Sequence, residues 1–302
     1  MKKNLLTILD FSREEIYELL NRAAALKKFH EENITHQPLA GKTLGMIFEK
    51  SSTRTRVSFE VGVFQLGGNS VFLSPRDTQI GRGEPVSDTA RILSSYVDAI
   101  LIRTFSQSVI EEFASYATVP LINGLSDLLH PCQVLSDIFT VKEMKGDIEG
   151  LKIAWVGDGN NMSNSWINAA LRIGFELVVA CPRSHRPDEG IMADVEKAGN
   201  KRIRIVDDPR EAVEEADVIN TDVWTSMGQE EESKARENVF QGYQVNSGLL
   251  SMARPDAIVM HCLPAHRGEE ITDEVMEGPQ SAIFEQAANR LHLQKAILEK
   301  LM

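Results

Sequence analysis

The sequence has few cysteines and no long apolar run. Its three cysteines, at positions 132, 181 and 262, form no C-x-x-C pair. An odd and widely spaced set predicts neither a disulfide framework nor a structural zinc site, and it fits a reducing cytoplasm. No stretch approaches the roughly 20 apolar residues that a membrane-spanning helix needs. We therefore expect a soluble cytoplasmic protein that is not bound to a membrane.

The chain also lacks an excess of positive charge. Its 44 acidic and 32 basic residues leave a formal net charge of -12. Binding of nucleic acid or of a membrane surface requires clustered Lys and Arg over a broad face, so this balance argues against both roles. The chain has 302 residues, of which 42% are hydrophobic. This length and composition suit two domains of about 150 residues each.

One short stretch departs from this acidic background. Residues 51–56 read Ser-Ser-Thr-Arg-Thr-Arg, between an apolar strand-like run and a segment with helical spacing of Val57, Val61 and Phe64. Unpaired amides at a helix N-terminus, the helix dipole and an arginine side chain together make a strong phosphate site. An ordinary Ser/Thr cap with two solvated arginines is the alternative. Because the chain is acidic, the cationic turn requires an anionic partner, either an internal carboxylate or a ligand.

Strand-like and helix-like segments alternate in two series. Strands are expected at 42–48, 70–73, 98–102 and 119–122, and then at 151–156, 175–180, 202–206, 217–220 and 257–261. Such alternation predicts parallel sheets with right-handed crossovers. We therefore predict an α/β protein of two doubly wound parallel-sheet domains, residues 1–145 and 146–283, with the active site in the cleft between them. The terminal helix, residues 284–302, is expected to pack on the first domain.

Several polar residues lie where such sheets bind ligands, at the carboxyl ends of strands. Arg103 is expected just past the end of its strand, and His130 at the entrance of a helix. For His130 a structural role is the alternative. The polar loop at residues 75–85 contains no lysine, and its length favours a function, with a plain surface connection as the alternative.

A Gly157-Asp158-Gly159 turn after a strand invites a dinucleotide-binding interpretation, which fails in detail. The third glycine of that motif would fall on Met162, and the end of the next strand offers no acid for a ribose. The turn does offer Asp158, Asn160 and Asn161 to a small polar ligand. A plain turn rich in Asp and Asn is the alternative.

Two further motifs follow strands of the second series. Residues 222–228 read DVWTSMG, and residues 261–268 read HCLPAHRG. One interpretation makes Cys262 a nucleophile with a neighbouring histidine, His261 or His266, as its base. Adjacent strand residues point to opposite faces, so the alternative is that residues 263–264 offer backbone carbonyls to a ligand. Arg290, in the terminal helix, either serves the cleft or is a solvated charge.

Four motifs together resemble the ornithine carbamoyltransferases: STRT at 52–55, HPCQ at 130–133, and the runs at 222–228 and 261–268. They occur in the order typical of that family, and the similarity covers essentially the whole chain. The first two are shared with aspartate carbamoyltransferases and indicate carbamoyl phosphate, whereas the last two indicate ornithine. The aspartate enzymes would carry a catalytic lysine in the loop at 75–85, where this chain has none.

The resemblance implies a transferase of arginine biosynthesis that moves the carbamoyl group of carbamoyl phosphate to the side-chain amine of L-ornithine, giving L-citrulline and phosphate. It implies no cofactor and no metal. It also implies a homotrimer, or a multiple of trimers, whose subunits share the loop that carries Gln79. The alternatives are another acceptor, such as putrescine or aspartate, and a dinucleotide-dependent or ligand-binding regulatory protein on the same fold.

Site residues are also implied by the resemblance. Its carbamoyl phosphate site falls on Ser52, Thr53, Arg54, Thr55, Gln79, Arg103, His130, Gln133 and Arg290, with backbone at Cys262 and Leu263. Its ornithine site falls on Asn161, Asp222, Ser226, Met227 and Cys262. The catalytic groups expected are Arg54, Arg103, His130 and Cys262.

Overall fold

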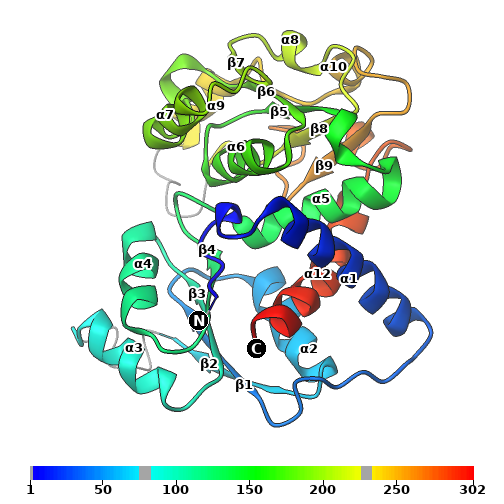
Figure 1. The fold of residues 1–302 in the computed structure, drawn as a ribbon. Helices are drawn as coiled ribbons and strands as arrows, with labels where there is room; N and C mark the ends of the chain where they lie inside the picture. Colours follow the sequence, from blue (N-terminus) through cyan, green and yellow to red (C-terminus); the bar gives the residue numbers. More distant parts are fainter. Residues whose placement is uncertain (1–2, 75–82, 226–232) are drawn as a thin grey trace. The chain divides into compact units, whose positions relative to one another are not determined.

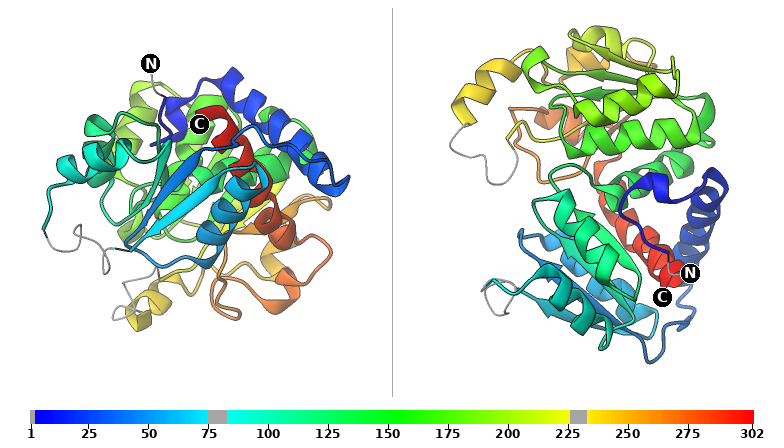
Figure 2. Two further views of the ribbon diagram at one scale, coloured as in Figure 1. Left: turned by 90° about the horizontal axis from the view of Figure 1, so that it is seen from below. Right: turned by 60° about the vertical axis from the view of Figure 1, so that its left-hand side comes forward.

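The computed structural model describes residues 3–74, 83–225 and 233–302, which form two compact units. The first comprises Met1–Phe139 with Asn289–Met302, and the second comprises Thr140–Ala288. Each unit holds one parallel β-sheet with helices on both faces, as Figures 1 and 2 show. The predicted fold class, two doubly wound parallel-sheet α/β domains, is thereby confirmed. The assignment of residues 1–145 and 146–283 to separate substrates stays a prediction.

The sheet of the first unit has the strand order β2-β1-β3-β4. Its strands are β1 (Thr43–Phe48), β2 (Asn69–Leu73), β3 (Ala99–Arg103) and β4 (Leu121–Leu125). Every residue of β3 and β4 is buried, as expected for strands covered on both faces. The sequence order reverses between β1 and β3. The loops after these two strands therefore lie at the switch point where doubly wound sheets bind ligands.

Helices cover both faces of this first sheet. They are η1 (Ile8–Asp10), α1 (Arg13–Glu31), α2 (Thr53–Gln65), α3 (Val86–Ser94), α4 (Gln107–Tyr116), α5 (Pro131–Lys145) and α12 (Ile283–Leu301). Figures 1 and 2 show α3 and α4 on one face of the sheet and α1, α2 and α12 on the other. On the first of these faces Ile100 and Ile102 of β3 pack with Ile110 and Phe113 of α4 in one apolar core. The chain leaves the first unit within α5 and returns to it within α12.

The sheet of the second unit has the strand order β7-β6-β5-β8-β9, again all parallel. Its strands are β5 (Lys152–Val156), β6 (Glu176–Ala180), β7 (Ile203–Val206), β8 (Val218–Thr221) and β9 (Ile258–His261). Here the order reverses between β5 and β8. The turns after these strands, which begin at Gly157 and at Asp222, therefore lie at the second switch point.

Short helices complete the second unit. They are η3 (Ile148–Gly150), α6 (Asn161–Ile173), η4 (Arg183–His185), α7 (Glu189–Lys197), α8 (Pro209–Val213), α9 (Ser233–Phe240), α10 (Ser247–Leu250) and α11 (Asp273–Met276). An apolar core joins Ala154 and Val156 of β5 to Ala212 of α8 and Val275 of α11. Among the described residues, no helix combines the length and the apolar character needed to cross a membrane.

Candidate functional site

The turn between β1 and α2 begins the α-helix with an N-cap. The Ser52 side chain accepts a hydrogen bond of 3.2 Å from the Thr55 amide, which satisfies one of the free donors of the helix N-terminus. Thr55 is buried, whereas Thr53 is exposed and lines a pocket of about 1000 Å³ together with Ser51 and Ser52. The cap interpretation is correct, and it leaves the amides and the dipole of α2 directed at this pocket edge.

The two arginines of this turn have different environments. Arg56 forms an ion pair with Glu60 at 3.0 Å, and its guanidinium lies 3.6 Å from the ring centroid of Phe72. Arg54 is half-buried, and no carboxylate of residues 3–74, 83–225 or 233–302 lies within ion-pair distance of it. The internal carboxylate that was one of two expected partners of the cationic turn is thus found for Arg56, as Glu60.

Arg290 of α12 joins this turn to α5. Its guanidinium donates to the Thr55 hydroxyl at 2.6 Å and to the side-chain carbonyl of Gln133. Gln133 in turn donates to Asp137 at 2.8 Å. Arg290 is only 3% exposed, so the alternative of a solvated charge is wrong. The structure thus brings together three residues that are far apart in the sequence and that the resemblance placed at one site.

Arg103 and His130 are the other candidates in the first unit. Arg103 is the last residue of β3, paired with Phe48 of β1, and not just past the strand as predicted. His130 directly precedes α5 and is 5% exposed. Burial and the charges of Arg290 and Arg103 hold the pKa of His130 well below its ordinary value of 6.5. Its imidazole is therefore neutral at neutral pH, able to donate one hydrogen bond without adding charge.

Asp222 is the centre of the polar residues in the second unit. It follows β8 and is 7% exposed. One carboxylate oxygen accepts from the Cys262 thiol at 2.9 Å and from the Val223 amide at 2.8 Å. The other accepts from the Asn160 side chain at 2.9 Å. Two of the predicted residues, Asp222 and Cys262, are therefore in direct contact, and the partner of the thiol is a carboxylate.

Asn160 also caps α6, which sets the position of Asn161. Its side-chain oxygen accepts from the amides of Met162 at 2.9 Å and Ser163 at 3.3 Å. Asn161 is then the first residue of the helix. Met162 and Trp166 are both buried. A plain Asx cap is present here, and it also positions a polar side chain beside the second switch point.

The glycines at 157 and 159 have internal uses that do not require a dinucleotide. A Cβ on Gly159 would lie 2.3 Å from the backbone carbon of Arg186, so only glycine allows the two chain segments to approach. The Gly159 amide donates to the His185 carbonyl at 2.9 Å. The close approach of η4 thus explains the motif, and the structure gives the dinucleotide interpretation no support.

Sequence reasoning missed a buried ion pair, Arg236 with Asp158, next to Asp222. The two side chains are 8% and 12% exposed. Burial raises the pKa of the Asp158 carboxyl to about 6 against the opposing effect of Arg236, and the charge of Asp222 adds to the rise. Arg236 also donates to the Trp224 carbonyl. Nothing in the polar segment around Arg236 distinguishes it from a solvated side chain.

A second buried pair, His261 with Glu270, shapes the loop after β9. Both side chains are 0% exposed and 3.0 Å apart. The Leu263 amide donates to Nδ1 of His261 at 2.9 Å, so Nε2 carries the proton and donates to Glu270. His261 is therefore not the base of Cys262, which bonds Asp222. Glu270 was not predicted, because its sequence neighbours give it the appearance of a solvated acid.

Within residues 3–74, 83–225 and 233–302, two groups of side chains offer enough ligand atoms for a metal ion. They are Asp222 with His261 and Cys262, and His266 with Glu269 and Glu270, each with its atoms within 4.8 Å of one another. In the first group both nitrogens of His261 already take part in hydrogen bonds within the protein. A metal would have to displace these bonds, so this arrangement is not that of a prepared metal site.

Three predicted residues lie outside the described part of the chain. They are Gln79, Ser226 and Met227.

Two family profiles match successive parts of the chain. The family profile described as "Aspartate/ornithine carbamoyltransferase, carbamoyl-P binding domain" matches residues 3–143. The profile described as "Aspartate/ornithine carbamoyltransferase, Asp/Orn binding domain" matches residues 149–301.

Individual relatives match over the full length. The ornithine carbamoyltransferase of Syntrophus aciditrophicus is 60% identical over 302 residues, covering 100% of both chains. The structure of ornithine carbamoyltransferase from Pyrococcus furiosus superposes with a TM-score of 0.93 at 48% identity, covering 98% of this chain and 96% of that one. The enzyme from Burkholderia thailandensis gives a TM-score of 0.91 at 48% identity, with 99% and 98% covered. The chain therefore belongs to the aspartate/ornithine carbamoyltransferase family, among the ornithine carbamoyltransferases.

Proposed function

We propose that the residues of the two switch points carry out carbamoyl transfer from carbamoyl phosphate to L-ornithine, giving L-citrulline and phosphate. The observation that carries the proposal is the cationic turn of the first unit. Arg54 has no carboxylate partner among the described residues, and Arg290 bonds Thr55 and Gln133 beside it. An acyl phosphate, which combines a phosphate group with a carbonyl group, suits this set of donors.

In this proposal the first unit binds carbamoyl phosphate, the carbamoyl donor. The amides of Ser52, Thr53 and Arg54 and the Arg54 guanidinium bind the phosphate oxygens. Arg103, the Thr55 hydroxyl and the neutral His130 donate to the carbonyl oxygen, which gains negative charge as the tetrahedral intermediate forms. Loss of one such donor typically lowers the rate by about 10² to 10³. Attack by the amine forms the C–N bond and with it the tetrahedral intermediate, whose collapse breaks the C–O bond and releases phosphate.

The second unit binds the acceptor. The Asp222 carboxylate receives the α-amine of ornithine, and Asn161 receives the α-carboxylate. An alkylamine with a pKa of about 10.4 is mostly protonated at neutral pH, so the nucleophile must lose a proton before it attacks. That first proton is released to solvent, and we propose that the departing phosphate takes the second proton, which the nitrogen loses once the C–N bond has formed. The Asp222 carboxylate disfavours aspartate, whose second carboxylate would require a cationic partner.

An acceptor assay tests the proposed function. The purified protein is given carbamoyl phosphate with L-ornithine, putrescine or L-aspartate, and each carbamoylated product is measured. We expect citrulline to form with the highest kcat/KM. Faster formation of carbamoyl-aspartate or carbamoyl-putrescine would contradict the choice of acceptor. A thermal shift caused by NAD but not by carbamoyl phosphate would favour the regulatory alternative.

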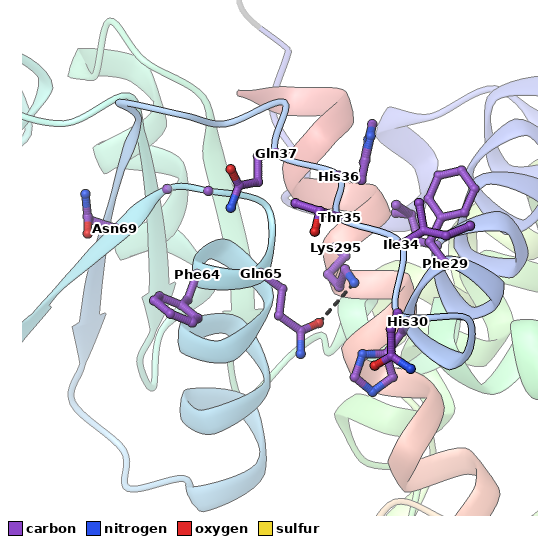
Figure 3. Close-up of a pocket in the computed structure, with 14 residues that line it drawn as sticks. Phe29, His30, Ile34, Thr35, His36, Gln37, Phe64, Gln65, Asn69 and Lys295 are labelled. Atoms are coloured by element: carbon purple, nitrogen blue, oxygen red, sulfur yellow. Dashed lines mark hydrogen bonds between the residues drawn. The ribbon is translucent and has the colours of Figure 1, made fainter.

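We also propose that the chain assembles as a homotrimer or a multiple of trimers. Val57, Val61 and Phe64 are 50%, 36% and 73% exposed along one side of α2, and Val71 of the edge strand β2 is 46% exposed. An apolar stripe beside an open sheet edge is typical of a surface that another chain covers. Phe64 also lines a pocket of about 430 Å³ beside Lys295 of α12 (Figure 3).

The assembly and the compartment are tested separately. Light scattering should give three times the mass of one chain, or a multiple of it, and Phe64→Glu should lower that mass. A monomer at micromolar concentration would contradict the trimer. The proposed cytoplasmic location is supported by three free cysteines, of which Cys132 and Cys181 are buried, and cell fractionation would test it.

A further inference from the structure

Lys50 directly precedes the cationic turn and is almost completely buried. Its side chain is 9% exposed, and its ammonium group is hydrogen-bonded to the Asp127 carboxylate, whose side chain is 60% exposed. The ammonium nitrogen also lies 4.5 Å from the ring centroid of Phe105. A buried ammonium group costs several kcal/mol in lost hydration, which its partner only partly offsets. A methionine or leucine would fill this space without that cost, so the charge calls for an explanation.

The three residues come from the loops that follow three adjacent strands. Lys50 follows β1, Phe105 follows β3 and Asp127 follows β4, and β3 lies between the other two in the sheet. The Lys50 side chain therefore reaches over the middle loop to the far one. The Asp127 amide donates to the Phe105 carbonyl at 2.7 Å, which ties the second and third loops together.

These are the same loops that carry the proposed donor site. The first continues into Ser52–Thr55, the second follows Arg103, and the third leads to His130. Neither Lys50 nor Asp127 belongs to the described lining of the pocket at the turn, although Glu49 and Ser51 on either side of Lys50 do. The pair is thus connected to the site through the backbone and not through a contact with the substrate.

We propose that Lys50 and Asp127 are positioning residues, which fix the phosphate-binding turn relative to His130. This inference rests on the proposed carbamoyl transfer. The physical reason is that oriented binding of reactants supplies a large share of rate enhancement, and a displacement of about 1 Å can cost 10²-fold. Without the pair, the turn at Ser52–Thr55, which binds phosphate, and His130, which donates to the carbonyl oxygen, are no longer held at fixed positions relative to each other.

The test compares two buried lysines that have similar partners. Lys145, at the end of α5, is also 9% exposed, and it bonds Asp256, whose side chain is 69% exposed. Lys50→Met should raise the KM for carbamoyl phosphate and lower kcat, with kcat/KM down by at least about 10-fold. The KM for ornithine should stay within twofold. Lys145→Met should leave both KM values and kcat within twofold of the parent.

Two further variants separate positioning from simple stability. Asp127→Asn, at a more exposed position, should show the same pattern with the fold retained, and the double variant Lys50→Met with Asp127→Asn should be no worse than Lys50→Met alone. Lys50→Arg keeps the charge and the ring contact and should recover most of the activity. An unchanged KM for carbamoyl phosphate in Lys50→Met, or equal losses in Lys145→Met, would overturn the proposal.

Failure of this inference can be distinguished from failure of the proposed function. If the parent protein forms no citrulline, the proposed function is wrong. Calorimetry with inorganic phosphate then still tests the pair, because an anion site held by Lys50 and Asp127 should bind phosphate at least about 10-fold more weakly in Lys50→Met than in Lys145→Met. Equal affinities in these two variants would reject the positioning role by themselves.

Discussion

The surroundings of a single residue determine which partners it has, as the two arginines of one turn show. Arg54 and Arg56 are two positions apart and have the same chemistry. Arg56 is neutralised by Glu60 and covered by Phe72, whereas Arg54 has no carboxylate within reach in the described part of the chain. The sequence alone does not distinguish them, because the distinction depends on the direction of each side chain from the first turn of α2.

Arg54→Ala should abolish measurable binding of carbamoyl phosphate while the fold is retained. A bidentate, charge-assisted contact is lost, and no other described group replaces it. Calorimetry with carbamoyl phosphate and circular dichroism are the two measurements. Arg56→Ala serves as the matched control and should have a much smaller effect. An affinity of Arg54→Ala equal to that of the parent would refute the role of Arg54.

Asp222→Asn should impair the use of ornithine and leave the binding of carbamoyl phosphate intact. The amide cannot replace a carboxylate that faces an ammonium group and that also accepts from the Cys262 thiol. Hydrogen bonds to charged groups contribute about 1.5–3 kcal/mol, so we expect the KM for ornithine to rise by about 10- to 100-fold. Steady-state kinetics with ornithine varied would show this. Near-normal citrulline synthesis would count against the assignment.

Residues that act at long range were the hardest to predict. Arg290 and Gln133 were placed by resemblance, and the structure joins them across 157 positions of sequence. Arg236 and Glu270 were missed, since each is one charged residue in a charged segment. Their burial follows from how the chain folds, which composition and spacing do not report.

At the level of elements, short apolar runs predicted the strands well. Every strand of both sheets overlaps a predicted one. The inner strands are covered on both faces and are therefore largely apolar, and the partly exposed edge strands β2 and β7 still contain short apolar runs. Their ends were less accurate. β4 was expected at 119–122 and is Leu121–Leu125, and β3 includes Arg103. Strand ends depend on pairing with neighbours, which the local sequence does not contain.

The N-cap of α2 allows a prediction about the stability of this helix that does not depend on ligand binding at the turn. Ser52→Ala should lower the free energy of unfolding by about 1 kcal/mol, because the Thr55 amide loses its acceptor. Ser52→Gly should lower the free energy of unfolding by only a few tenths of a kcal/mol. Urea unfolding measures both. Equal stability of Ser52→Ala and the parent would mean that the cap contributes nothing to the helix.

For the molecule as a whole, the buried His292 predicts how stability depends on pH. It lies in α12 and is 7% exposed. Burial, with the charges of Lys295, His30 and Lys27, lowers its pKa from 6.5 to about 4. Below pH 6.5 the unfolded chain takes up a proton that the folded chain does not. Stability should therefore fall as the pH falls from 6.5 to about 4.

The low pKa of His292 should reduce the free energy of unfolding by about 2 kcal/mol at pH 5, because each pH unit below 6.5 lowers it by roughly 1.4 kcal/mol. Urea unfolding of the parent and of His292→Gln at pH 7 and pH 5 would measure it. The variant should lose less stability between these two values, although His130 still contributes in the same direction. The exposed His266→Gln is the control variant. Parallel losses in the parent and His292→Gln would contradict the assignment.

The return of the chain to the first unit through α12 has a consequence for biosynthesis. Arg290 lies far beyond β4 in the sequence and is translated after it, yet it bonds Thr55 and Gln133 in the unit that contains β4. A nascent chain can therefore form that sheet while its donor site still lacks a guanidinium. The proposed donor site is therefore complete only once α12 has been made and has packed on the first unit.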